Sequence, residues 1–220
     1  MKKESQLQKT TLRQFLLVLV NLIVIVCVIW SQTQFFFFRG QGNMRVTGVK
    51  TFWYFTNDSN ILHAVSCLAV LIWQVCTGGR KREMPYPLLI FCHVAATAVS
   101  VTLVTVLLFL GPRLGYASMF AGWTLYLHLL GPLLAIFSFL FLEEGPELKK
   151  KHTCLAAMPV FVYALFYLYY VVLRRTWPDF YGFNMHGKWY ISFVVMLAAA
   201  YGLGALLRIL RGLFTPTGRK

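Results

Sequence analysis

The sequence contains few charged residues, and acidic ones are especially scarce. Charged side chains make up 13% of the 220 residues, and only 7 residues are Asp or Glu. A soluble domain carries about 25% charged residues, because water has to solvate its surface. Hydrophobic residues account for 58% of this chain instead. The composition excludes a soluble globular enzyme and a disordered chain, and it predicts an all-α, polytopic membrane protein.

The sequence also lacks the usual signatures of metal, redox and disulfide sites. Its five cysteines form no Cys-x-x-Cys pair, and most of them lie inside apolar runs. Such residues are typical of small apolar positions in helices. No His-Glu-x-x-His or similar ligand spacing occurs. We therefore predict no metal site and no cofactor.

Apolar runs follow one another along the whole chain. None of them alternates with period two, so helices are the spanning structure that fits. The first run is too long for the core of a signal peptide, and we expect it to remain as a signal anchor. We predict a single integral membrane domain, residues 1–220, with six transmembrane helices at about 12–30, 51–75, 86–110, 120–142, 154–173 and 189–210.

The basic residues predict the topology. Of the 21 Lys and Arg, 14 fall in the N-terminal segment, the second-to-third loop, the fourth-to-fifth loop and the C-terminal segment. By the positive-inside rule both termini are cytoplasmic. The net charge is +14, but the sequence contains no nucleic-acid-binding module. The expected partner is therefore the bilayer and not a nucleic acid. We expect the plasma membrane in a bacterium, or the endoplasmic reticulum in a eukaryote.

The second predicted span carries the most polar stretch inside any span, Thr56-Asn57-Asp58-Ser59-Asn60. Asp58 is the only acidic residue within a span, and there it needs a partner, a proton or water. Other polar residues recur at helical spacing and should share one face that turns into the bundle. These residues are Thr56, Ser59, Asn60, His63, Ser66 and Cys67.

Three histidines lie within predicted spans, namely His63, His93 and His128. Gly131-Pro132 follows His128 and should kink its helix. Thr56 and His128 each lie about six residues below the outer start of their span, which is roughly 9–12 Å along the axis. A hydroxyl and an imidazole at one depth form a minimal nucleophile–base pair.

Other segments have simpler expected roles. The amides of Asn57 and Asn60 are candidate oxyanion donors beside Thr56. Residues 174–187 are rich in aromatics and turn formers, which is typical of a lid or lip. Glu143 and Glu144 are expected in a solvated loop. Four aromatics at helical spacing are candidates for the wall of an acyl-chain channel, although the spacing favours core packing: Tyr163, Phe166, Tyr167 and Tyr170.

Two segments resemble a known family. Phe52–Leu62 (FWYFTNDSNIL) resembles the second-helix motif F-x-x-F-T-x-x-S-N-x-L of a family of small six-helix bacterial membrane proteins, and Leu127–Leu134 (LHLLGPLL) resembles its fourth-helix motif L-H-x-x-x-P-x-L. That family is similar in layout to the eukaryotic androgen-induced and androgen-dependent tissue-factor-pathway-inhibitor-regulating proteins. Those proteins hydrolyse fatty acid esters of hydroxy fatty acids. The resemblance implies that Thr56 is the nucleophile and His128 its partner.

The leading hypothesis is therefore an intramembrane hydrolase of long-chain acyl esters, in which Thr56 is the nucleophile and His128 the base. Asn57, Asp58, Ser59, Asn60, His63 and His93 are candidate binding or supporting residues. One alternative is a proton-coupled transporter or channel for a small solute, using Asp58 and the intramembrane histidines. The other is a non-catalytic, lipid-binding membrane scaffold. The identity of the substrate and the oligomeric state stay open.

Overall fold

The computed structural model describes residues 2–38, 47–78 and 83–214, and within these ranges it contains helices and no strand. The α-helices are α1 (Lys2–Phe37), α2 (Phe55–Thr77), α3 (Tyr86–Thr105), α4 (Gly111–Leu114), α5 (Tyr116–Met119), α6 (Gly131–Phe137), α7 (Lys150–Tyr167) and α8 (Trp189–Phe214). Short 3-10 turns are η1 (Gly48–Trp53) and η6 (Met185–Gly187). The π-helical turns are η2 (Val106–Leu110), η3 (Tyr126–Leu130), η4 (Ser138–Leu142) and η5 (Leu168–Leu173).

Five helical segments are long and apolar enough to cross a membrane, as in an integral membrane protein. They are Thr11–Phe37, Phe55–Thr77, Tyr86–Leu114, Lys150–Leu173 and Trp189–Phe214. These segments agree with five of the six predicted spans. The predicted span at 120–142 corresponds to a shorter apolar helix, Tyr126–Leu142. The first residues of the predicted span instead include a turn at Ala121–Trp123.

Two of the π-helical turns end at a Gly-Pro pair, as the physical chemistry of proline requires. Pro132 has no N–H to donate to the carbonyl four residues earlier, and its ring pushes that carbonyl away. The chain accommodates the proline by widening the preceding turn, η3, which carries His128. Pro112 follows η2 in the same way. The expected distortion at Gly131-Pro132 is thus confirmed, as a π-helical turn.

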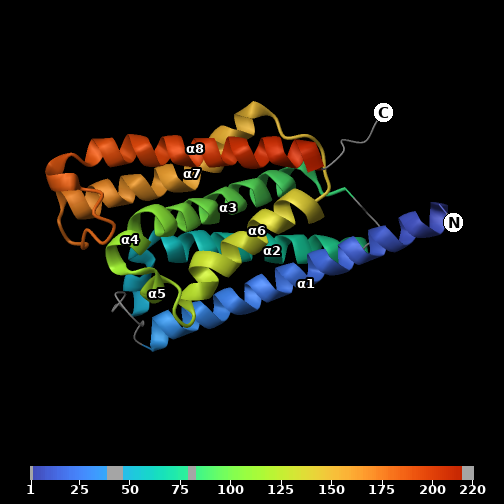
Figure 1. The fold of residues 1–220 in the computed structure, drawn as a ribbon, viewed down its shortest axis with the longest axis horizontal. Helices are drawn as coiled ribbons and strands as arrows, with labels where there is room; N and C mark the ends of the chain where they lie inside the picture. The colour runs from blue at the N-terminus through green and yellow to red at the C-terminus, as the bar shows by residue number, and fades with distance from the viewer. Residues whose placement is uncertain (1, 39–46, 79–82, 215–220) are drawn as a thin grey trace.

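Helix α3 forms the centre of the bundle. In the most apolar stretch of 18 residues in this segment, 72% of the residues are buried. In the other four long segments the corresponding share is 28% or less. Helix α3 packs against α2, α6, α7 and α8. Figure 1 shows α7 and α8 running side by side along one flank, with α1 along the opposite flank. The outward side chains of α1, α7 and α8 include many large apolar residues, such as Val26, Phe166 and Val194, as expected for surfaces that face lipid.

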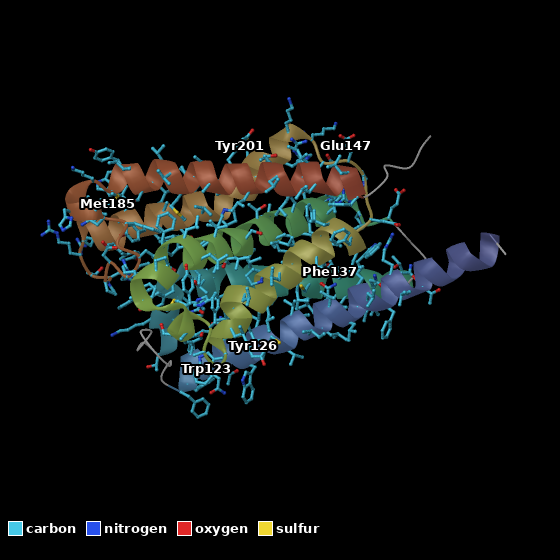
Figure 2. All side chains as sticks on the ribbon, in the orientation of Figure 1. Trp123, Tyr126, Phe137, Glu147, Met185 and Tyr201 are labelled. Atoms are coloured by element: carbon cyan, nitrogen blue, oxygen red, sulfur yellow. The ribbon has the colours of Figure 1, made fainter. Side chains whose placement is uncertain are left out.

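The bundle has two distinct ends. The start of α1 and the end of α8 lie at the same end (Figure 1). Figure 2 shows Glu147 toward that end, with Met185 at the opposite one. The loop after α4, the chain around Met119 and the segment 174–187 gather at the Met185 end. The predicted candidate site belongs to this half of the bundle.

The expectation that Glu143 lies in a solvated loop is wrong. Its side chain is buried and accepts a hydrogen bond of 3.0 Å from the Ser138 hydroxyl. Arg211 of α8 is also buried, and its Nη2 donates to the carbonyl oxygens of Glu143 at 2.8 Å and Gly145 at 3.3 Å. Arg211 therefore caps the end of η4. Glu144 lies farther out and pairs with Arg13 of α1.

Candidate functional site

A cavity lies between α2, α3, α7 and α8, in the half of the bundle that contains Met185. The space without atoms in and around it is about 610 Å³, which includes open solvent. The lining is mostly apolar and aromatic. Its buried members are Phe55, Thr56, Thr102, Thr105, Val160, Tyr167 and Tyr181. Its partly exposed members are Tyr163, Ala164, Leu168, Phe183, Trp189, Ser192, Phe193 and Met196.

The positions of the buried and partly exposed lining residues indicate which side of the cavity is enclosed and which is open. The buried lining comes mainly from α2 and α3, and the partly exposed lining comes mainly from α7 and α8. Exposed apolar side chains such as Leu165 and Val194 flank the partly exposed side. The cavity is therefore most enclosed at its α2 and α3 end, which includes Thr56, and most open on the side of α7 and α8.

Thr56 is the second residue of α2. The sequence predicted that it lies about six residues below the start of its helix, and this is wrong, because η1 occupies residues 48–53 and α2 begins only at Phe55. Thr56 is 3% exposed and lines the cavity. Its carbonyl oxygen accepts hydrogen bonds from Asn60 Nδ2 at 2.8 Å and from the Ser59 hydroxyl at 3.1 Å.

Tyr181 lies beside Thr56, and the sequence did not single it out. The chain 174–187 was predicted as a lid, and Tyr181 is the lid residue that reaches the buried end of the cavity. Its hydroxyl lies near the Thr56 side chain and near the backbone N–H groups of Phe55 and Thr56. Among the described residues it has no partner at ordinary hydrogen-bond geometry. Burial raises the pKa of Tyr181 above its ordinary range, so its hydroxyl stays protonated.

The lid is fixed by Asp179. The Asp179 carboxylate accepts hydrogen bonds from the Tyr167 hydroxyl, from the Phe183 N–H at 3.0 Å and from the Asn184 N–H at 3.2 Å. Arg113 also donates to the carbonyl oxygen of Phe180 from across the bundle end. These bonds hold Tyr181 and Phe183 over the cavity.

Two of the four aromatics that were candidates for a channel wall line the cavity, and two do not. Tyr163 and Tyr167 line the cavity. Phe166 is 51% exposed on the outside of α7, and Tyr170 stacks on Trp177 at 4.4 Å between ring centroids. A spacing of three and four residues spreads side chains over a face wider than the cavity.

His128 is buried in η3, and its tautomer is set by the backbone. Its Nδ1 lies 2.7 Å from the carbonyl oxygen of Met119. A carbonyl can only accept, so Nδ1 carries the proton and Nε2 of the neutral ring has a free lone pair. Nε2 has no hydrogen-bond partner among the described residues. This is the tautomer that a general base requires.

Thr56 and His128 come from neighbouring helices, but no hydrogen bond joins their side chains in the described part of the chain. Asn60 connects the two helices, because its Nδ2 donates to the carbonyl oxygens of both Thr56 and Leu127, at 2.8 and 3.1 Å. Gly131 makes this approach feasible, since a Cβ there would lie 3.1 Å from Asn60 Oδ1. His128 does not line the cavity.

Asn57 and Ser59 hold the start of α2 in place. Asn57 donates to the carbonyl oxygen of Thr51 at 2.8 Å and accepts from Gln32 Nε2 at 3.2 Å. Ser59 shares a hydrogen bond of 2.9 Å with Thr102 of α3. The predicted burial of the polar stripe on α2 is confirmed, since all six of its members are buried.

Asp58 lies in the first turn of α2, so it is close to a helix end and not at mid-helix. It is partly exposed, and its carboxylate makes no hydrogen bond or ion pair with the residues that the structure describes. It interacts electrostatically with Tyr163 and Tyr181. A carboxylate at a helix N-terminus is favoured by the helix dipole, which reduces the need for a partner.

His63 and His93 lie away from the cavity. His63 is seven residues below Thr56 on α2, or about 10 Å along the axis. His93 donates from Nε2 to the carbonyl oxygen of Gly204 at 2.8 Å, and its ring stacks on Phe139. No hydrogen bond connects either histidine to Asp58 within the described ranges. His93 therefore joins α3 to α8.

Among the described residues, no group of three or more His, Cys, Asp or Glu side chains is placed to hold a metal ion. The polar side chains that line the cavity carry hydroxyl groups, apart from the indole of Trp189. Comparisons of the chain with family models, with curated proteins and with solved structures gave no match.

Proposed function

We propose that the chain is a six-span membrane protein with both termini in the cytoplasm. The five long apolar segments support this, together with Tyr126–Leu142 as a short sixth span. With 17 residues, that helix reaches the lower end of the length range for spanning helices. The shared end of the bundle for the start of α1 and the end of α8 (Figure 1) agrees with an even number of crossings. The excess of basic residues at that end supports a cytoplasmic position for it.

Within this frame we propose an intramembrane hydrolase of long-chain acyl esters. The observation that carries the proposal is that the Thr56 side chain lies at the buried end of an apolar cavity whose partly exposed side lies between α7 and α8. A lipid in the bilayer can enter such a cavity chain first without crossing water. The family resemblance of the segments around Thr56 and His128 points to the same chemistry.

The proposed reaction has two steps. The Thr56 oxygen attacks the acyl carbonyl carbon while its proton passes through one water molecule to His128 Nε2. The ester C–O bond then breaks, and the alcohol leaves with that proton. In the second step water attacks the Thr56 ester, again with His128 as base, and the fatty acid leaves. The net reaction consumes one ester and one water and yields one acid and one alcohol.

The test is hydrolysis of a long-chain acyl ester by the full chain in lipid nanodiscs. Thr56→Ala should reduce turnover by at least about 100-fold, because it removes the nucleophilic oxygen. A fluorophosphonate probe should label the wild-type chain and not Thr56→Ala. Thr33→Ala is the matched control, since the Thr33 hydroxyl bonds only to the Ile29 carbonyl of its own helix. Wild-type turnover by Thr56→Ala would refute the proposal.

A second candidate is lipid binding without turnover. It is favoured by the lack of a hydrogen bond between Thr56 and His128 in the described residues, because the reaction needs a proton path between them. Under this candidate, acyl lipids bind in the same cavity, the wild type hydrolyses no ester, and neither Thr56→Ala nor His128→Ala changes that. The turnover measurement above separates the two candidates.

A further inference from the structure

The buried end of the cavity contains hydrogen-bond donors that the protein itself leaves free. Phe55 and Thr56 are the first two residues of α2, and N–H groups at these positions have no acceptor within a helix. No backbone carbonyl of the described residues accepts from them either. Both residues line the cavity together with Tyr181, and their N–H groups lie near the Tyr181 hydroxyl without a hydrogen bond to it.

Tyr181 provides an independent sign that this spot receives a ligand. Its side chain is 7% exposed, its hydroxyl has no hydrogen-bond partner at ordinary geometry, and its ring lines the cavity. A buried hydroxyl without a partner is costly, because it has given up hydrogen bonds to water. Tyr163, by contrast, is satisfied, since its hydroxyl donates to the carbonyl oxygen of Trp53 at 2.8 Å. Tyr181 therefore has a proton to donate to something inside the cavity.

The charge around the spot restricts what that ligand is. Asp58 is the acidic residue that interacts with Tyr163 and Tyr181, and in its ionised form it repels a second carboxylate. The apolar lining disfavours a hydrated headgroup. A neutral oxygen with a partial negative charge, such as an ester carbonyl, satisfies the donors without this repulsion.

We propose that the Tyr181 hydroxyl and the N–H groups of Phe55 and Thr56 bind the carbonyl oxygen of a neutral long-chain acyl ester. This inference rests on the proposed function and deepens it. The carbonyl carbon would then face the Thr56 oxygen, and the same three donors would stabilise the negative charge that develops when Thr56 attacks. Tyr181 is thereby assigned as a catalytic residue that touches the substrate.

The experiment uses a ligand that keeps the carbonyl and has no bond to hydrolyse. The full chain in nanodiscs is saturated with carbonyl-labelled 2-heptadecanone, and the C=O stretch is recorded by infrared difference spectroscopy. In the wild type a hydrogen-bonded band should appear below the frequency of the ketone in lipid. Tyr181→Phe should move the band upward and weaken ketone affinity by about 3- to 10-fold. Tyr190→Phe, a change of an exposed tyrosine on α8, should leave both unchanged.

Two further arms keep the inference open to refutation. Heptadecane has no carbonyl, so its affinity should be the same in the wild type and in Tyr181→Phe, which also shows that the variant is folded. Asp58→Asn should strengthen binding of palmitate, an anion, and leave ketone binding unchanged. An unshifted ketone band in Tyr181→Phe, or unchanged palmitate affinity in Asp58→Asn, would overturn the inference and leave the hydrolase proposal standing. If the wild type hydrolyses no ester but still shows the bound ketone band, the hydrolase proposal is overturned and the inference about carbonyl binding stands.

Discussion

The hydroxyl of Tyr167, the last residue of α7, donates a hydrogen bond to the carboxylate of Asp179 in the lid. The same carboxylate accepts the backbone N–H groups of Phe183 and Asn184. One acidic side chain thus holds the loop closed on itself and ties it to a wall of the cavity. Because Tyr181 lies between Asp179 and Phe183, its position beside Thr56 depends on this contact.

Asp179→Ala should loosen the lid. The change leaves a buried tyrosine hydroxyl and two N–H groups without their acceptor, which costs about 1–3 kcal/mol. Amide hydrogen exchange over 176–187 should rise, with little change in α3. Lys188→Ala, at an exposed position beside the lid, is the control. Equal exchange in the two variants would show that Asp179 does not hold the lid.

Gly131→Ala should destabilise the bundle. A Cβ at this position would lie 2.8 Å from the Tyr126 carbonyl oxygen and 3.1 Å from Asn60 Oδ1, so the bridge from α2 to Leu127 has to shift. We expect a loss of about 1–3 kcal/mol, measured as a lower melting temperature in detergent. Gly202→Ala is the matched control, because a Cβ there meets nothing within 4 Å. Equal melting temperatures for the two variants would contradict the prediction.

Glu143 should make the stability depend on pH. Burial raises the pKa of its carboxyl to about 7, from an ordinary value of 4.5. Between these values the folded chain holds the proton and the unfolded chain releases it. The contribution of Glu143 to stability is therefore most favourable below pH 4.5 and declines as the pH rises to about 7.

Glu143→Gln removes this dependence. It should raise the unfolding free energy above pH 7 by about 3 kcal/mol, relative to its effect below pH 4.5. Melting curves of the two proteins across this pH range measure the difference. Glu147→Gln, at an exposed position toward the same end, should follow the wild type. A Glu143→Gln variant with the wild-type pH slope would show that the slope has another source.

Thr56 and His128 should act as one unit. If His128 serves only to take the proton of Thr56, Thr56→Ala and His128→Ala should each remove nearly all turnover, and the double variant should lose little more. Thr56→Ser keeps the hydroxyl and should retain measurable turnover. If the fold-loss of turnover in the double variant equals the product of the two single losses, the two residues act independently.

The topology predicts opposite labelling of the two bundle ends. In a background without native cysteines, Met185→Cys should react with an impermeant maleimide added outside intact cells. Glu147→Cys should react only after permeabilisation. Labelling of both positions from one side would exclude the six-span arrangement.

Hydrophobic runs predicted the helices well. Side chains that face the protein core or the lipid are apolar, so the composition of a segment reveals a spanning helix. The polar stripe on α2 was predicted for the same reason, since spacing alone fixes which residues share a face. The start of α2 was not predicted. Residues 51–53 were included in the predicted span, but residues 48–53 form the 3-10 turn η1, and only contacts such as Asn57 with Thr51 reveal it.

Tyr181 could not be found from the sequence either. It lies in a loop, 125 residues beyond Thr56, and no periodicity relates the two. What brings them together is the set of hydrogen bonds around Asp179 and the donation from Arg113 to Phe180. Aromatic content marked the lid, but which of its rings faces inward depends on tertiary packing.

The partly exposed side of the cavity lies between α7 and α8, among outward apolar side chains such as Leu165 and Val194. A ligand that enters there has already dissolved in the bilayer, so its relevant concentration is its number per lipid molecule and not its number per litre of water. Added inert lipid or detergent should therefore slow binding at constant total ligand by surface dilution. Half-saturation should depend on mole fraction and remain the same when the volume of buffer is changed.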